Sequence, residues 1–226
     1  MLVELLTQIL VALLFASQLF SLVKSMSFPL NKRDFVIKQV WKKNGDDSFS
    51  VATISTEGNQ DYGGNMGKLR GTSKAVFTAT NIEGIGGVKQ CRTEMYLYID
   101  VGGYVPAWVM NKKIPQGLGS TNSMARSFNR DDEIDRAALN SLVSKMKNIP
   151  QSFSHEDMNV INKAQKFVDD NNKSQDFVKV MSPDKMVQMK LVHIEGENIA
   201  IGMATSVVDA SVEICAASEY TDISSR

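Results

Sequence analysis

The residue types that most often carry catalysis or bind metals are scarce in this chain of 226 residues. Cys91 and Cys215 lie far apart, each in an apolar stretch, and neither belongs to a CxxC motif or to a Cys/His spacing typical of zinc. The only histidines are His155 and His193, too few for a histidine-based metal site or a catalytic triad. We therefore expect two buried, reduced thiols, and no metal or cofactor.

Two further kinds of chemistry lack support. The glycine pairs at 63–64, 86–87 and 102–103 form neither a GxGxxG motif nor a P-loop, and no Ser, Cys or Lys occupies a recognisable nucleophile motif. Lys plus Arg and Asp plus Glu number 25 each, so no net positive charge attracts nucleic acid. The sequence thus predicts neither an enzyme nor a nucleic-acid-binding protein.

The hydrophobic N-terminal segment, residues 1–25, has two competing interpretations. Nineteen consecutive residues between Glu4 and Lys24 carry no charge, which just meets the length of a membrane-spanning helix. Polar residues at helical spacing also fit a packing helix of a soluble protein. A signal peptide is less favoured because the segment has no basic start and no clear cleavage site. We expect a cytoplasmic protein, with membrane association through this segment as the open alternative.

Residues 27–148 read as short β-strands followed by helices. Strands are expected at 35–41, 49–54, around 69–79 and at 88–100, with an Asn44-Gly45 hairpin turn between the first two. In the last strand a period of two separates an apolar from a mostly polar face, as in an antiparallel sheet covered on one side. The apolar face holds Cys91, Thr93, Met95, Leu97 and Ile99. A helix is expected to begin at Pro106, to be interrupted by Pro115, Gly117 and Gly119, and to be followed by a helix over 131–147.

Three motifs in this part resemble a known family. The segment IDVGGYVPAWVMNK (99–112) resembles the end of a START domain, the lipid-transfer fold related to steroidogenic acute regulatory protein, where the last strand enters the C-terminal helix. FPLNKRDFVIKQVW (28–41), with Pro29, Arg33, Asp34 and Phe35, resembles an earlier strand of that family, and MGKLRG (66–71) with Arg70 resembles the element between them. The resemblance covers about residues 27–127, the C-terminal part of such a domain.

Residues 149–226 are similar to the beginning of a START-like domain: a helix starting near Ser154, strand-like runs at 187–194 and 199–208, and a helix from Asp209. The expected fold class is therefore α+β, a helix-grip fold with a curved antiparallel sheet and a long C-terminal helix, either incomplete or circularly permuted. The chain is either a slice of a tandem array or a single permuted domain. The second arrangement requires residues 187–205 to pair with the sheet of the first part.

The resemblance implies non-enzymatic binding, and transfer, of a lipid or sterol-like hydrophobic molecule in a tunnel between sheet and helix. The implied ligand-binding residues are Phe77, Thr93, Met95, Leu97, Trp108 and Val109. The other interpretation of each is simple core packing. Arg33, Asp34, Arg70 and Asp100 are expected to be structural, while Arg92 and Glu94 form a solvated pair unless they face inward and orient a polar head group. The alternative functions are a protein-interaction or spacer module without ligand, and an enzyme on the same scaffold.

Overall fold

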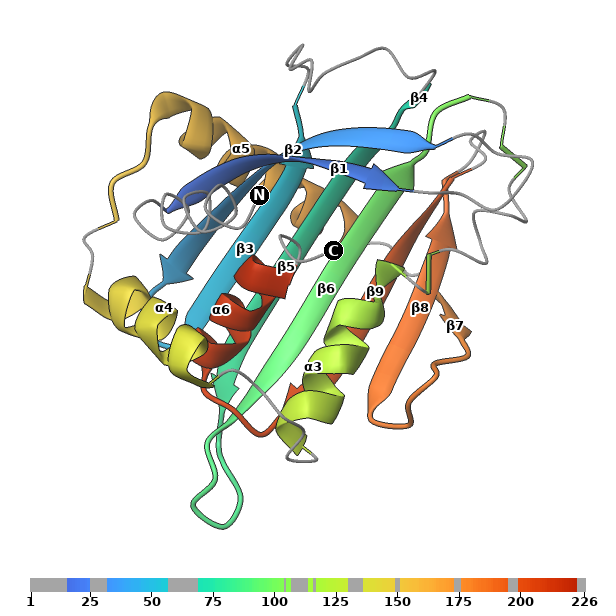
Figure 1. Cartoon of the computed structure of the whole chain (residues 1–226). Coiled ribbons are helices and arrows are strands. Elements are labelled where there is room, and N and C mark those ends of the chain that lie inside the picture. The colour runs from blue at the N-terminus through green and yellow to red at the C-terminus, as the bar shows by residue number, and fades with distance from the viewer. Residues whose placement is uncertain are drawn as a thin grey trace.

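The computed structural model describes residues 16–24, 32–56, 69–103, 105–106, 114–115, 117–129, 136–148, 151–172, 176–194 and 199–222. Nine strands of this part form one sheet in the order β1-β2-β3-β5-β6-β9-β8-β7, with β4 parallel to β2 beside it and all other pairs antiparallel. The strands are β1 Ser17–Lys24, β2 Arg33–Asn44, β3 Ser48–Ser55, β4 Leu69–Arg70, β5 Thr72–Ile82, β6 Gln90–Asp100, β7 Val178–Val180, β8 Val187–His193 and β9 Ala200–Val208. The curved sheet and its helices confirm the predicted α+β helix-grip class (Figure 1).

Helices cover both faces of the sheet. On one side, here called the inner face, lie α3 (Gly119–Asn129), α4 (Arg136–Asn148) and α6 (Val212–Asp222), with α6 over β3 and β5 (Figure 1). The other side, here called the outer face, is partly covered by α5 (His155–Asn172). After β6 the described helices are α3 and α4, in agreement with the expected interruption near Pro115 to Gly119 and the further helix expected over 131–147.

The inner face holds the main hydrophobic core. Register places successive strand residues on alternate faces, so one set of side chains from six neighbouring strands meets α3, α4 and α6. The buried apolar members of this set on the sheet are Trp41, Phe49, Val51, Ala75, Phe77, Ala79, Cys91, Met95, Leu97, Val187, Met189, Leu191, Ala200, Ala204 and Val208. Small residues of α6, such as Ala216 and Ala217, let that helix lie close to the sheet, where both are fully buried.

The outer face departs from the expected solvent-exposed side. Val160 and Ala164 of α5 pack on Val40, Ala52 and Val76, so this face is buried under the helix at β2, β3 and β5. The start of α5 follows the predicted capping motif: the Asp157 amide donates to Ser154 Oγ, and the Ser154 amide donates to Asp157 Oδ2, each at 3.1 Å. The one-sided pattern inferred from residues 88–100 therefore does not extend to these strands.

The N-terminal segment also differs from expectation where it is described. Residues Ser17–Lys24 form the edge strand β1, paired along its length with β2, rather than the end of a helix. Residues 1–15 lie outside the described part. A continuous apolar run does not separate a strand from a helix by periodicity alone, which explains the error. Among the described helices, none has the length and apolar character needed to cross a membrane.

The two parts of the sequence meet inside one sheet. Strand β6 pairs with β9 over eight residues, from Cys91 opposite Val208 to Tyr98 opposite Ile201. Strand β8 pairs with the far side of β9. This is the pairing that the permuted arrangement requires of residues 187–205.

Candidate ligand-binding site

Four of the six predicted site residues lie together on the inner face. Phe77 of β5 and Thr93, Met95 and Leu97 of β6 are all buried, and Phe77 lies directly opposite Met95. Their period-two spacing is sufficient to place them on one side of the sheet, facing the helices. Trp108 and Val109, the predicted lid residues, fall outside the described residues. Whether any of these side chains contacts a ligand stays a prediction.

Helix α3 contacts this group of side chains directly. The Ser120 hydroxyl donates to Met95 Sδ at 3.2 Å, and the Thr121 hydroxyl lies 3.7 Å from the same sulfur. Both hydroxyl-bearing residues are buried. A thioether is a weak acceptor, so these two hydroxyls can exchange their sulfur partner for a better acceptor at small cost.

Ile114 and Leu118 precede α3, and together with it they are here called the α3 segment. They lie against β9 at a position that only glycine allows. A Cβ added to Gly202 would stand 2.5 Å from Ile114 Cγ2 and 3.0 Å from Leu118 Cδ1, and both of those residues are buried. The absence of a side chain on β9 therefore lets the α3 segment close onto the sheet.

We expect Gly202→Val to push the α3 segment off the sheet. Overpacking of this kind costs about 1–3 kcal/mol, which urea-induced unfolding of the full chain would measure. The matched control is Met203→Leu, a volume-conserving change on the opposite face of the same strand, with an expected cost below about 1 kcal/mol. Equal stability of Gly202→Val and the wild type would contradict the close packing of α3 on β9.

A buried polar group lies on the inner face near β1 and the end of α6. Gln39 is fully buried, and its carbonyl accepts a hydrogen bond from the Gln18 amide, which also donates to the Tyr220 carbonyl oxygen at 3.1 Å. Within the described chain, Gln39 Nε2 and the Tyr220 hydroxyl have no acceptor. Burial raises the pKa of Tyr220, and the nearby charge of Asp157 adds to this, so the hydroxyl keeps its proton and remains a donor.

Unsatisfied buried donors are costly, at about 1–3 kcal/mol each, and are uncommon in native proteins. The interior also buries other polar residues, among them Thr93, Ser120, Thr121 and Glu219. Two donors that lack an acceptor among the described residues nevertheless fit a site whose acceptor arrives with a ligand. Sequence reasoning missed both residues. The signal for Gln39 was present, because it is the one polar residue among the period-two positions that run from Phe35 to Trp41 on β2.

The charged residues of the three motifs, which were expected to be structural, have structural contacts. Arg70 Nη2 lies 2.9 Å from Asp34 Oδ2, and Arg33 Nε donates to the Val101 carbonyl oxygen at 2.6 Å. Asp100 accepts from the Gly102 amide at 2.8 Å. These contacts fit the structural role expected from the sequence.

The Asp-x-Gly-Gly turn that follows β6 requires its glycine. Gly102 has φ +66°, and a Cβ there would lie 2.5 Å from the Arg70 carbonyl oxygen. This turn carries the chain from the end of β6 toward the α3 segment. The motif therefore has a structural role at the end of β6.

The alternative in which Arg92 and Glu94 face inward is wrong. Both alternate with the buried inner-face residues Thr93 and Met95, so they lie on the outer face, and Arg92 is exposed. The next residue on that face, Tyr96, hydrogen-bonds Asn172 at the end of α5. Neither charge can orient a head group on the inner face.

Comparison with protein families agrees with this geometry. The START domain model matches residues 15–129, half of the chain, from β1 through α3. The chain belongs to the START domain family. The match covers Phe77, Thr93, Met95, Leu97 and Gln39. Neither a curated protein nor a solved structure gives a match to the chain.

START family membership assigns a function at a coarse level. Domains of this family bind lipids or other hydrophobic ligands, and they are typically binding modules rather than enzymes. The sequence resemblance predicts the ligand site between the inner face and its covering helices, and this location stays a prediction.

Proposed function

We propose that this chain binds one lipid or sterol-like molecule between the inner face of its sheet and helices α3 and α6, without catalysing a reaction. The observation that carries the proposal is a predominantly apolar interior holding buried donors that lack acceptors, at Gln39 and Tyr220. A ligand with a long apolar body and one acceptor oxygen, such as a hydroxyl or carbonyl group, fits this chemistry. An uncharged oxygen is favoured because both donors are neutral.

Ligand entry requires α3 to move. The α3 segment packs on Gly202 and Met95, so no large ligand passes between them while these contacts hold. Pro115, Gly117 and Gly119 lie where this segment begins, and they weaken helical continuity there. We propose that this region is the hinge of a lid formed by α3.

The substitution Gln39→Leu separates ligand recognition from folding. It removes the donor that lacks an acceptor and keeps a similar volume, so we expect the stability of the ligand-free protein to be unchanged or to rise by about 1 kcal/mol. Affinity for a ligand that bonds to this donor should fall about tenfold. Titration with a fluorescent sterol and with a fluorescent phospholipid measures the affinity, and urea-induced unfolding measures the stability.

The control is Gln188→Leu, an exposed glutamine on β8. It should leave affinity unchanged. If Gln39→Leu binds both probes as tightly as the wild type, Gln39 takes no part in ligand recognition and this placement of the polar end is wrong.

A module without ligand, acting in protein interaction or as a spacer, is the second candidate. The close contact of Ile114 and Leu118 with Gly202 favours it, since these side chains fill space on the inner face. The two candidates differ in one outcome. A ligand-free module shows no saturable binding of either fluorescent probe, whereas the proposed binding protein saturates at one probe per chain.

We also propose that residues 27–148 and 149–226 together form one circularly permuted domain. The pairing of β6 with β9 and the burial of α6 on the inner face support this arrangement. In it, the part resembling the end of a START domain precedes the part resembling its beginning.

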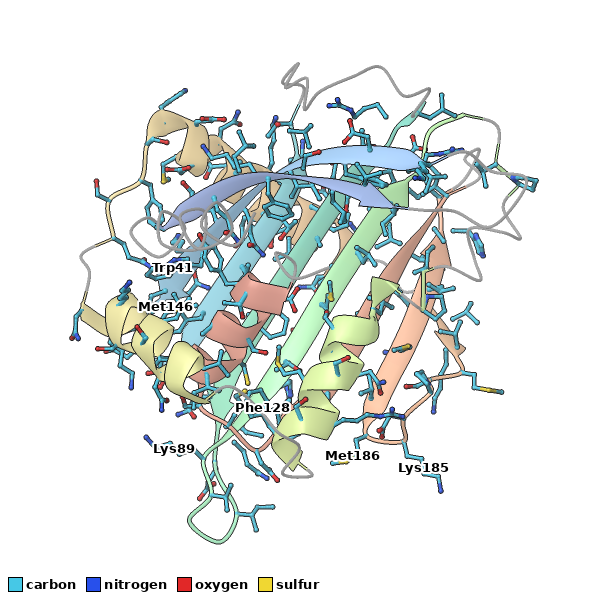
Figure 2. All side chains as sticks on the ribbon, viewed as in Figure 1. Trp41, Lys89, Phe128, Met146, Lys185 and Met186 are labelled. Atoms are coloured by element: carbon cyan, nitrogen blue, oxygen red, sulfur yellow. The ribbon has the colours of Figure 1, made fainter. Side chains whose placement is uncertain are left out.

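Transfer of the ligand between membranes is the finer form of the proposal. Exposed apolar side chains near the β5–β6 and β7–β8 connections lie at one end of the sheet: Ile85, Val88, Met181 and Met186. Figure 2 shows Lys89, Phe128, Lys185 and Met186 at this same end. A transfer assay between donor and acceptor vesicles carrying the fluorescent sterol tests whether the protein accelerates exchange.

A further inference from the structure

The two cysteines, which appear unrelated in the sequence, are in contact in the fold. Cys91 Sγ and Cys215 Sγ lie 3.2 Å apart although 124 residues separate them, and both residues are fully buried. Cys91 lies near the start of β6 on the inner face, and Cys215 lies on α6. The contact therefore connects the strand at the centre of the sheet to the helix that covers it.

Burial excludes solvent and dissolved oxidants from both thiols while α6 is in place. The neighbouring Cys91 thiol and burial both raise the pKa of Cys215 well above its ordinary value, and the charge of Glu213 adds to this. A neutral, solvent-excluded thiol is a poor nucleophile. Reaction therefore occurs while the chain folds or when α6 opens.

We propose that Cys91 and Cys215 form an intrachain disulfide under oxidising conditions and that this bond ties α6 to β6. A disulfide requires an S–S distance of about 2.05 Å, so the sulfurs need to approach by only about 1.1 Å, within reach of small side-chain rotations. With glutathione disulfide as oxidant, one thiolate forms a mixed disulfide and releases one glutathione. The second thiolate then attacks the protein sulfur and releases another, so two thiols and one glutathione disulfide give the protein disulfide and two glutathione molecules.

The bond would close a long loop and fix α6 on the sheet. Cross-linking residues so distant in sequence removes much conformational freedom from the unfolded chain. We expect the oxidised protein to melt roughly 5–15 °C above the reduced protein. Since α6 also carries Tyr220, oxidation would hold that side of the proposed site in one position.

The test refolds the full chain in glutathione buffers of graded oxidising power, which avoids dependence on access to buried thiols. Intact mass after acid quenching and alkylation counts the thiols. We expect a monomer that is lighter by two hydrogens, with Cys91 linked to Cys215 in peptide mapping. In native buffer it should form at a ratio of reduced glutathione to glutathione disulfide at least tenfold higher than the ratio at which the same chain oxidises in urea.

Two controls complete the test. Cys91→Ser and Cys215→Ser should each lose the bond and the rise in melting temperature. Should either variant fail to fold, the comparison of wild type in native buffer and in urea decides alone. A folded chain that keeps both thiols at ratios that oxidise the chain in urea would overturn the proposal, as would mixed glutathione adducts or linked dimers in place of the intrachain bond.

Discussion

Removing residues 150–226 will abolish the cooperative unfolding transition of the remaining chain. The deletion uncovers the β6 edge over the eight residues that pair with β9, and it removes α6 from the inner face, where Cys215, Ala216 and Ala217 are fully buried. It also removes α5 from the outer face. A domain is stable by only about 5–15 kcal/mol, so the loss of two helices and of the partner of a central strand exceeds what the rest can supply. Urea-induced unfolding followed by circular dichroism measures the transition.

Complementation provides the control for this deletion. Residues 1–149 and 150–226, expressed together as two chains, should associate and recover a cooperative transition, because every strand pair of the sheet can then form. If residues 1–149 unfold cooperatively on their own, the first part is an independent module, and the proposal of one permuted domain is wrong.

The second large effect is expected at an ion pair that joins the same two parts. Lys38 of β2 lies 2.9 Å from Asp157 Oδ1 and 2.8 Å from Glu156 Oε2, both in the first turn of α5. The Lys38 and Asp157 side chains are each only 10% exposed. Lys38→Met would leave the Asp157 charge buried beside an apolar chain. We expect a loss of about 3 kcal/mol in unfolding free energy.

The control is Lys43→Met, which breaks an ion pair with Asp46, whose side chain is 95% exposed. Exposed pairs of this kind contribute between zero and about 1 kcal/mol, so little change is expected. A loss for Lys38→Met no larger than for Lys43→Met would contradict the burial of this pair under α5.

The contribution of the ion pair depends on pH at both ends of the range. Burial opposes the charge on Lys38, but the hydrogen bonds and charges of Glu156 and Asp157 outweigh it and raise the pKa of Lys38 above 10.5. The stabilisation that the Lys38 charge gives to the folded state is therefore present below that pH and is lost as pH rises through the folded pKa. Burial likewise opposes the charge on Asp157, but hydrogen bonds from Lys38 and Ser154 hold the pKa of Asp157 below 3.8. The stabilisation that the Asp157 charge gives to the folded state is therefore present above that pH and is lost as pH falls through the folded pKa. The stability difference between wild type and Lys38→Met should therefore be constant from about pH 5 to pH 9 and shrink outside this window.

Strands with clear alternation could be predicted from the sequence, and strands without it could not. The β6 residues alternate apolar and polar, and both their strand and their inner face were predicted correctly. Strand β1 lies in a continuous apolar run, and the three-residue β7 is too short to show a pattern. In β1, Leu19 and Val23 are nearly half exposed, so composition gives no sign of which face is buried.

The candidate site was predictable only in its apolar part. Period-two spacing places Phe77 and Met95 on one face because strand geometry is local. The contacts of Gln18 with Gln39 and with Tyr220 of α6, and of Cys91 with Cys215, depend on pairing between segments up to about 200 residues apart, which no local pattern specifies. The resemblance of three motifs to the family predicted the fold class. That residues 27–148 and 149–226 share one sheet is seen only in the pairing of β6 with β9.

Native mass spectrometry of the full chain, expressed in lipid-containing cells and purified without detergent, tests the ligand-binding proposal most directly. The full chain is required because β1 begins at Ser17. We expect a monomer carrying one noncovalent adduct with the mass of a lipid or sterol, released when the protein unfolds. A folded protein without any adduct, which also fails to take up the fluorescent sterol or phospholipid, would contradict ligand binding and favour an interaction module.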